Sequence, residues 1–253
     1  MYPDERQRDI LAEVRAHGRV DVVTLAGALK VTPETIRRDL AVLARQGGIR
    51  RVYGGAVLAR THAFEPALAR RNEQLGTEKE RIAQFALKEL PESGVLVLDS
   101  GSTTEAIARA LPTDRELTVV TNALPIATLL AANPAVEVWC TGGRLRKQTL
   151  AVVDEWARQM LSSITADVAF IGADGISATK GLTTVKPLEA AVKSTMIAAA
   201  RHRVVVTDHS KIGRDAFCRF AELSEIDLVI TDSEVEDDLA DELEALGPRV
   251  VRA

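Results

Sequence analysis

Cysteine is scarce in this sequence of 253 residues, which contains only Cys140 and Cys218. Neither lies in a C-x-x-C pair or near a pair of histidines, so the sequence suggests neither a disulfide framework nor a zinc site. We expect two ordinary buried thiols, no metal and no cofactor.

Long apolar runs are also missing. No stretch approaches 18 uninterrupted apolar residues, which argues against a membrane-spanning helix. The first ten residues, MYPDERQRDI, are charged where a signal peptide needs an apolar core. We therefore expect a cytoplasmic protein with no membrane partner.

Charge is distributed unevenly along the chain, although the net charge is only −4. Residues 1–60 hold 11 basic and 7 acidic residues, a net charge of +4, which leaves −8 for the rest. A basic segment before an acidic body suggests a polyanionic partner for the first part alone, although many basic patches have no such partner.

Three short segments with helical apolar spacing open the chain. Their apolar pairs and triplet are Ile10/Val14, Leu25/Leu29 and Ile36/Leu40/Leu43. The run GIRRVYGGAVL follows and is typical of a two-stranded wing with a glycine pair near its turn or exit. We predict a small domain over residues 3–58 with one core of its own.

The rest of the chain has a different pattern. Residues 59–77 contain Pro66 and many charges without a clean apolar period, which predicts a linker. Over residues 78–253, helical segments alternate with β-rich runs. This alternation predicts an α/β domain with a mostly parallel sheet covered by helices on both faces.

The third helical segment has the features of a DNA-reading helix. Thr32 is a good N-cap and Pro33 is favoured at the first helical position, so the helix is expected to begin there. Thr35, Arg37 and Arg38 then fall in the first two turns, off the apolar stripe. That end of a recognition helix meets base edges, and arginine can bind guanine or phosphate with its planar fork.

The wing that follows supports this interpretation, and one alternative remains. Arg50 and Arg51 in the wing would add phosphate contacts that position the reader. The alternative is a merely solvated helix face, with Arg38 paired to Glu34 four residues earlier.

These features together resemble a known family. The stretch VDVVTLAGALKVTPETIRRDLAVLARQGGIRRVYGGAV closely resembles the signature of DeoR-family transcriptional regulators, with TIRRDL and GGA intact. The resemblance implies a winged helix-turn-helix on double-stranded operator DNA. It also implies a second domain similar in fold to sugar-phosphate isomerases and CoA transferases. Such a protein is expected to be a repressor of a sugar or sugar-derivative operon, released by a phosphorylated metabolite. Because paired half-sites favour paired readers, we expect a homo-oligomer, a dimer or tetramer.

The stretch VLVLDSGSTTEAIARAL predicts a strand, a glycine-containing loop and a helix. A helix N-terminus at the carboxyl end of a parallel strand attracts phosphate. The alternative is that Ser102 and Glu105 only form a capping box. Four more strands end in small or polar residues, at 121–122, 141–143, 172–175 and 207–211, which favours a binding crevice.

Two lysines are candidates for countercharge. Lys193 could instead pair with Glu189 at the favoured helical spacing, and Lys211 could simply be solvated. His209 could titrate, but a lone exposed histidine is the simpler interpretation. The resemblance implies that the effector pocket is lined by Asp99, Gly101, Ser102, Thr103, Thr104, Thr121, Asn122, Asp174, Lys193 and Lys211.

An enzyme is the rival interpretation, because the second domain resembles isomerases. The related isomerases carry an acidic residue directly after a G-A-D stretch, where this chain has Gly175. Asp174 and Glu189 remain as substitutes, without an accompanying nucleophile, metal cluster or nucleotide fingerprint. The chain also departs from the family pattern after Gly142-Gly143, where Ala151 and Asp154 replace the usual serine and glycine. This departure leaves the identity of the effector open.

Overall fold

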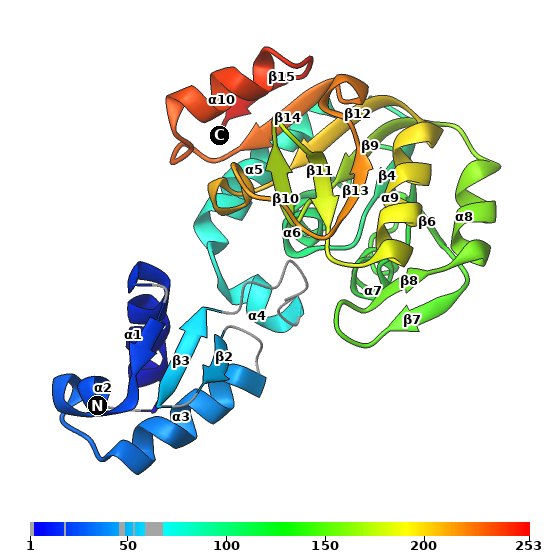
Figure 1. The fold of residues 1–253 in the computed structure, drawn as a ribbon. Helices are drawn as coiled ribbons and strands as arrows, with labels where there is room; N and C mark the ends of the chain where they lie inside the picture. The colour runs from blue at the N-terminus through cyan, green and yellow to red at the C-terminus, as the bar shows by residue number, and fades with distance from the viewer. Residues whose placement is uncertain (1–2, 18, 46–48, 53, 59–67) are drawn as a thin grey trace. The chain divides into compact units, whose positions relative to one another are not determined.

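A computed structural model describes residues 3–17, 19–45, 49–52, 54–58 and 68–253. The chain forms two compact units, residues 1–66 and 67–253 (Figure 1). Each unit has its own hydrophobic core. Residues 59–67 of the predicted linker lie outside the described residues. Residues 68–77, also predicted as linker, form helix α4 (Leu68–Glu73) and the start of α5 (Gly76–Ala86) in the second unit.

The first unit packs three helices against a three-stranded antiparallel sheet. Its elements are α1 (Pro3–His17), β1 (Arg19–Asp21), α2 (Val22–Leu29), α3 (Pro33–Arg45), β2 (Ile49–Val52) and β3 (Gly55–Leu58). Five of the predicted stripe residues, Ile10, Val14, Ile36, Leu40 and Leu43, are at most 2% exposed. The apolar spacing therefore places these helices around one core, and β1 adds a third strand to the wing.

The glycine pair connects the wing to the helices. Gly54 adopts a φ of 79°, a left-handed conformation that favours glycine, and its carbonyl accepts the N–H of Val22 at 2.9 Å. A Cβ on Gly55 would lie 2.0 Å from the Val20 carbonyl oxygen. The two positions thus need glycine for different reasons, one for its conformation and one for space.

The second unit is built on a seven-stranded parallel sheet in the order β15-β14-β12-β9-β4-β5-β6. Its strands are β4 (Gly94–Leu98), β5 (Leu117–Thr121), β6 (Val136–Cys140), β9 (Ala166–Ile171), β12 (Ala200–Val206), β14 (Leu228–Thr231) and β15 (Arg249–Arg252). The prediction of a mostly parallel sheet is confirmed. Chain order proceeds from β4 to β5 and β6 on one side and from β9 to β15 on the other, so it reverses between β4 and β9.

Helices cover both faces of this sheet, as the alternation predicted. Helices α5, α6 (Ser102–Ala110) and α7 (Leu124–Leu130) pack on one face. Helices α8 (Glu155–Ser162), α9 (Pro187–Ala199) and α10 (Asp237–Glu244) pack on the other. Among the described residues, no helix is long and apolar enough to span a bilayer.

Three smaller features were not predicted. Strands β7 (Arg144–Arg146) and β8 (Ala151–Val153) form a hairpin beside α7. Strands β10 (Gly175–Ser177), β11 (Gly181–Thr184) and β13 (Cys218–Ala221) form a small antiparallel sheet. The expectation of buried thiols was wrong, because Cys140 is exposed at the end of edge strand β6 and Cys218 is only partly buried.

Candidate nucleic-acid interface and anion pocket

Helix α3 begins where the sequence predicts. The Thr32 hydroxyl oxygen accepts the backbone N–H of Thr35 at 3.2 Å, and helix α3 starts at Pro33. The two threonine hydroxyl oxygens lie 2.9 Å apart, within hydrogen-bonding distance. The cap therefore fixes the first turn and holds the Thr35 side chain against it.

Arg37 and Arg38 of α3 are exposed, while Ile36 and Leu40 beside them are buried. Arg37 lies 3.3 Å from Glu34 in an exposed ion pair, a contact of small energetic value. The alternative pairing of Arg38 with Glu34 does not form, because Glu34 faces Arg37. Arg38 makes no ion pair with any residue in the part of the chain that the structure describes.

A buried ion pair braces this helix from behind. The Asp39 carboxylate accepts Arg6 Nε at 2.6 Å and Gln7 Nε2 at 3.0 Å, which joins α3 to α1. Asp39 and Arg6 are both less than a tenth exposed. Asp39 therefore orients the face that carries Arg37 and Arg38. This role of Asp39 was not predicted from the sequence, although Asp39 lies inside the TIRRDL motif.

The predicted wing arginines lie on β2. Arg51 is exposed and pairs in register with Ala56 of β3. Arg50 pairs with Val57, and its side chain is outside the described ones. The first unit thus presents Thr35, Arg37, Arg38 and Arg51 around one helix and an adjacent strand.

The second unit has a polar pocket at the point where its strand order reverses. Its empty space, including the part open to solvent, is about 470 Å³. The ends of β4 and β9 contribute Gly101 and Gly172, and the segment at the end of β12 contributes Val206, Thr207, Asp208, Ser210 and Lys211. Ligands commonly bind at such a switch point in open parallel sheets. The strand ends after β5 and β6, also predicted as parts of the crevice, do not line this pocket.

One wall of the pocket is the N-terminus of α6. Gly101 is the N-cap and offers no side chain, so the backbone N–H groups of Ser102, Thr103 and Thr104 have no acceptor among the described residues. The alternative of a capping box is wrong. Ser102 is already helical, and Glu105 instead binds Asn72 and Arg109.

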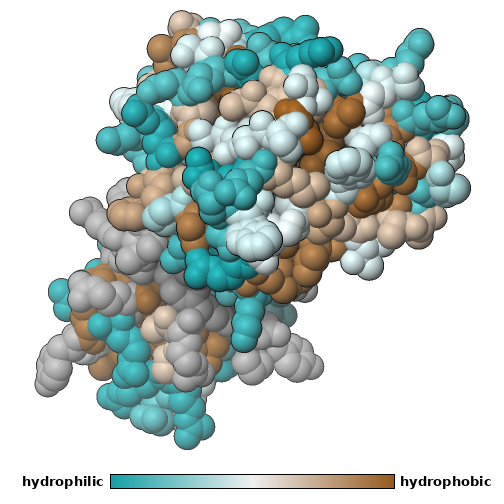
Figure 2. Space-filling model, turned by 90° about the vertical axis from the view of Figure 1, so that its right-hand side faces the viewer, coloured by the Kyte–Doolittle hydropathy of each residue, from teal (hydrophilic) through white to brown (hydrophobic). Residues whose placement is uncertain are grey.

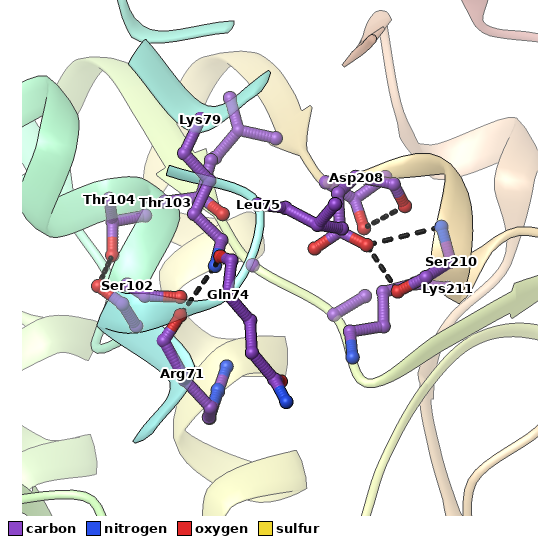
Figure 3. A pocket seen from close by; sticks show the side chains of 15 residues that line it. Arg71, Gln74, Leu75, Lys79, Ser102, Thr103, Thr104, Asp208, Ser210 and Lys211 are labelled. Atoms are coloured by element: carbon purple, nitrogen blue, oxygen red, sulfur yellow. Dashed lines mark hydrogen bonds between the residues drawn. The ribbon is translucent and has the colours of Figure 1, made fainter. Parts of the chain in front are cut away.

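Three cations from different elements face this helix end. Figure 3 shows Arg71 and Gln74 between Ser102 on one side and Lys211 on the other. Among the lining residues, Arg71, Lys79 and Lys211 stand against one carboxylate, Asp208, which leaves a net charge of +2. A phosphate monoester carries about −1.5 to −2 at neutral pH, so its charge matches.

The pKa values of both lysines reflect this crowding. Burial lowers the pKa of Lys79, and so do Arg71 and Lys211, while Asp208 opposes the shift. Burial and Arg71 also lower the pKa of Lys211, with Asp208 again opposing. Both ammonium groups are thus incompletely compensated, a condition that a bound anion would relieve.

Five of the ten predicted effector residues line this pocket: Gly101, Ser102, Thr103, Thr104 and Lys211. Asp99 and Lys193 instead form a buried ion pair behind it, with Asp99 also accepting the Gly172 N–H at 3.0 Å. The predicted alternative for Lys193, a surface pair with Glu189, does not form, because Glu189 is buried and paired with Arg146.

The other three predicted residues are held by hydrogen bonds outside the lining. The Thr121 hydroxyl donates to the Leu98 carbonyl at 2.6 Å, and Asn122 Nδ2 donates to the Val152 carbonyl at 3.1 Å. Asp174 accepts the Thr184 hydroxyl at 2.8 Å and lies 3.9 Å from Arg71. Burial alone would raise the pKa of Asp174, but Arg71 and Lys193 outweigh it and hold that pKa below its usual value.

Arg71, Gln74 and Lys79 are polar pocket residues that were not predicted from the sequence, and Leu75, which also lines the pocket, was not predicted either. Arg71 and Gln74 fall in the predicted linker. The sequence around Lys79 predicts only a solvated lysine at the start of a helix. The available signal for Arg71 and Lys79 is the resemblance to the DeoR family, which continues through both positions. His209, considered as a lone exposed residue, is paired with buried Asp232 at 2.9 Å. The described residues hold no cluster of histidine, cysteine and carboxylate side chains that could bind a metal ion.

A capped helix with exposed arginines in one unit and a net positive pocket beside a helix N-terminus in the other are features of one class of proteins, the ligand-responsive DNA-binding regulators. Comparison with known families agrees. The DeoR-like helix-turn-helix domain matches residues 6–62, and the DeoR C-terminal sensor domain matches residues 75–233. The chain therefore belongs to the DeoR family of transcriptional regulators.

Several regulators are similar to this chain over nearly their whole length. The HTH-type transcriptional regulator GlpR of Haloferax volcanii is 38% identical over 99% of this chain and 98% of its own. The HTH-type transcriptional repressor GlcR of Bacillus subtilis is 34% identical over 92% and 89%. The glycerol-3-phosphate regulon repressor of Escherichia coli is 34% identical over 92% of both chains.

Among solved structures, ribose 5-phosphate isomerase A of Methanocaldococcus jannaschii aligns with 53% of this chain and 52% of its own. The identity is 19% and the TM-score is 0.39, values too low to carry any inference about activity.

Proposed function

We propose that the protein represses a sugar or sugar-derivative operon and that a phosphorylated metabolite releases it from its operator. The observation that carries the proposal is the net positive pocket around the open N-terminus of α6. The similar regulators named for glycerol 3-phosphate support a phosphorylated effector.

At the DNA end, Thr35, Arg37 and Arg38 are proposed to contact base edges and phosphates in the major groove. Arg50 and Arg51 are proposed to contact backbone phosphates beside it. Because phosphate contacts release counterions, operator affinity should fall steeply as salt rises. A flat salt response would exclude this mode of binding.

At the effector end, we propose that a phosphate group accepts the free N–H groups of Ser102, Thr103 and Thr104. Arg71, Lys79 and Lys211 would supply the opposite charge. Charge-assisted hydrogen bonds of this kind are worth about 1.5–3 kcal/mol each, so a small pocket can hold a small anion. Asp99 and Lys193 would act indirectly by fixing the loop at Gly172.

Catalysis by an isomerase mechanism is the second candidate, and the local geometry disfavours it. A Cβ on Gly175 would lie 2.5 Å from the Arg214 carbonyl oxygen, so the acidic residue of the related isomerases has no room there. Glu189, one substitute base, is held by Arg146 and by the Thr149 hydroxyl at 3.0 Å. We therefore propose that the pocket binds its ligand without turning it over.

A homo-oligomer is proposed to form through an apolar face of the second unit. Figure 2 shows hydrophobic surface gathered on the side where α8 and the β7–β8 hairpin lie. Trp156 is 75% exposed and Trp139, on edge strand β6, is 46% exposed. Exposed Leu124 and Leu150 are adjacent, since the Leu124 N–H donates to the Leu150 carbonyl. An open sheet edge beside such a patch favours a second copy of the chain.

A thermal-shift screen tests the effector part of the proposal. Glycerol 3-phosphate, other sugar phosphates and inorganic phosphate would be added to the full chain, with the unphosphorylated sugars as controls. Thr103→Glu should abolish the shift, since it puts a carboxylate where the phosphate is expected, while Thr103→Gln serves as the neutral match. A screen in which no phosphate ester gives a shift would reject the sensor proposal. Product formation from any of them would restore the enzyme alternative.

A further inference from the structure

Helix α4 is the first described element after the segment that follows β3 of the first unit. It is held to the rest of the second unit by contacts at both ends. The Leu68 N–H donates to the Gln148 carbonyl at 3.2 Å. At the other end, Lys79 Nζ donates to the carbonyl oxygens of Arg71 and Gln74, the first at 2.5 Å. The chain therefore passes from the first unit into the second unit through α4.

Lys79 has two roles in this arrangement. Its ammonium group satisfies carbonyl oxygens at and just beyond the C-terminal end of α4, which have no partner within the helix. The same side chain lines the anion pocket and is 5% exposed. An ammonium group has three N–H donors, and two are used by these carbonyls, which leaves one for an anion.

Arg71 brings α4 to the same place. Its nearest carboxylate oxygen, on Asp174, is 3.9 Å away, beyond hydrogen-bonding distance. Its Nη2 lies 3.7 Å from the position that a Cβ on Gly101 would take, beside the N-terminus of α6. An anion bound at that N-terminus would therefore meet one cation from α4 itself and one that holds the end of α4.

We propose that α4 is a latch that a bound phosphate group closes, and this inference rests on the proposed effector site. Without an anion, Arg71, Lys79 and Lys211 repel one another, which weakens the docking of α4. With an anion, the same three charges are attracted to one point and α4 is fastened to α6. Because residues 59–67 join α4 to the wing in the chain, occupancy of the pocket changes the restraint on the first unit through the covalent chain.

Hydrogen exchange of the full chain, read by mass spectrometry over residues 68–77, tests the latch. The probes are glycerol 3-phosphate and inorganic phosphate. If the anion binds only when α4 is docked, exchange should slow by about tenfold at a free probe concentration of about ten times Kd. Operator affinity, measured in parallel, should change with the same probe dependence.

Two variants, each with one cation removed, distinguish coupling through α4 from a general loss of positive charge in the pocket. Arg71→Gln removes a cation carried by α4, whereas Lys211→Gln removes one from the opposite wall. Both should weaken probe binding. At probe concentrations that saturate each variant, Lys211→Gln should still protect residues 68–77, and Arg71→Gln should lose most of the protection and the operator response. Tryptophan fluorescence, reporting Trp139 and Trp156 of the second unit, checks that each variant is folded.

The possible results distinguish failure of the latch from failure of the effector site. Probe binding with unchanged exchange over residues 68–77 would overturn the latch and leave the proposed effector site standing. Equal behaviour of the two variants at saturation would also overturn it. Failure of every phosphate ester to bind the wild-type chain would overturn the effector site and the latch together.

Discussion

Replacing Asp39 by alanine should unfold the DNA-reading unit while leaving the sensor unit intact. Asp39 and Arg6 are buried and paired at 2.6 Å, and Gln7 donates to the same carboxylate. Removing one member of a buried pair leaves the other charge uncompensated and costs about 3–5 kcal/mol. A unit of this size has a net stability of about 3–10 kcal/mol at 0.05–0.15 kcal/mol per residue. The loss is therefore comparable to the whole stability of the unit.

The two tryptophans make this measurable in the full chain. Both lie in the second unit, so their fluorescence follows only that unit during urea unfolding, whereas far-ultraviolet circular dichroism follows both. Asp39→Ala should shift the part of the dichroism transition that fluorescence does not report. The double variant Arg6→Met/Asp39→Leu should recover most of the loss, because apolar replacement of both partners is often neutral. If Asp39→Ala leaves both transitions within about 0.5 kcal/mol of wild type, a typical surface effect, the brace is not structural.

Three further predictions concern the reader, the wing and the pocket. Arg37→Ala or Arg38→Ala should weaken operator binding in a filter or anisotropy assay without lowering the stability of the sensor unit; unchanged affinity in both would remove them from the interface. Gly55→Ala should destabilise the wing by about 1–3 kcal/mol through overpacking, whereas Gly27→Ala, with open space around it, should stabilise α2 by up to about 1 kcal/mol. Phosphate affinity, measured by calorimetry, should be highest at neutral pH and fall as the pH rises toward 10.5. The reason is that Lys79 and Lys211 have lowered pKa values in the free pocket and must be protonated to bind phosphate. Binding at alkaline pH should therefore take up protons, and the absence of proton uptake would contradict the role of the two lysines.

Local periodicity was sufficient to predict the main fold. The seven parallel strands follow from short β-rich runs such as VLVLDS and DVAFIGADG, and the reader follows from three apolar stripes. The β7–β8 hairpin and the β10-β11-β13 sheet, whose strands have three or four residues, were not predicted. The strand GLTT is buried throughout, and its burial depends on α9 and β13 rather than on its own apolar content.

The pocket was predictable only where its residues follow a strand. The N-terminus of α6 and Lys211 satisfy that condition, so local pattern found them. Arg71 enters from a short helix between charged, proline-containing sequence and α5, and no periodic signal separates such a helix from a linker. Asp99 and Lys193 are 94 residues apart, and their pairing depends on β4, β9 and α9 meeting at one end of the sheet.

Asp99 and Lys193 lie at the end of the sheet and form a buried ion pair. Because this pair is neutral, the net positive charge of the pocket is carried by residues outside the sheet. Asp99 accepts both Lys193 and the Gly172 N–H, while Lys193 also donates to the Gly172 carbonyl at 2.9 Å. This pair fastens the ends of β4 and β9, and its own charges cancel. The cations that line the pocket come instead from α4, α5 and the turn after β12, which lie outside the strand pairing of the sheet. A bound anion shifts a conformational equilibrium only through groups that it contacts differently in the two states, so a response is expected in these elements rather than in the paired strands.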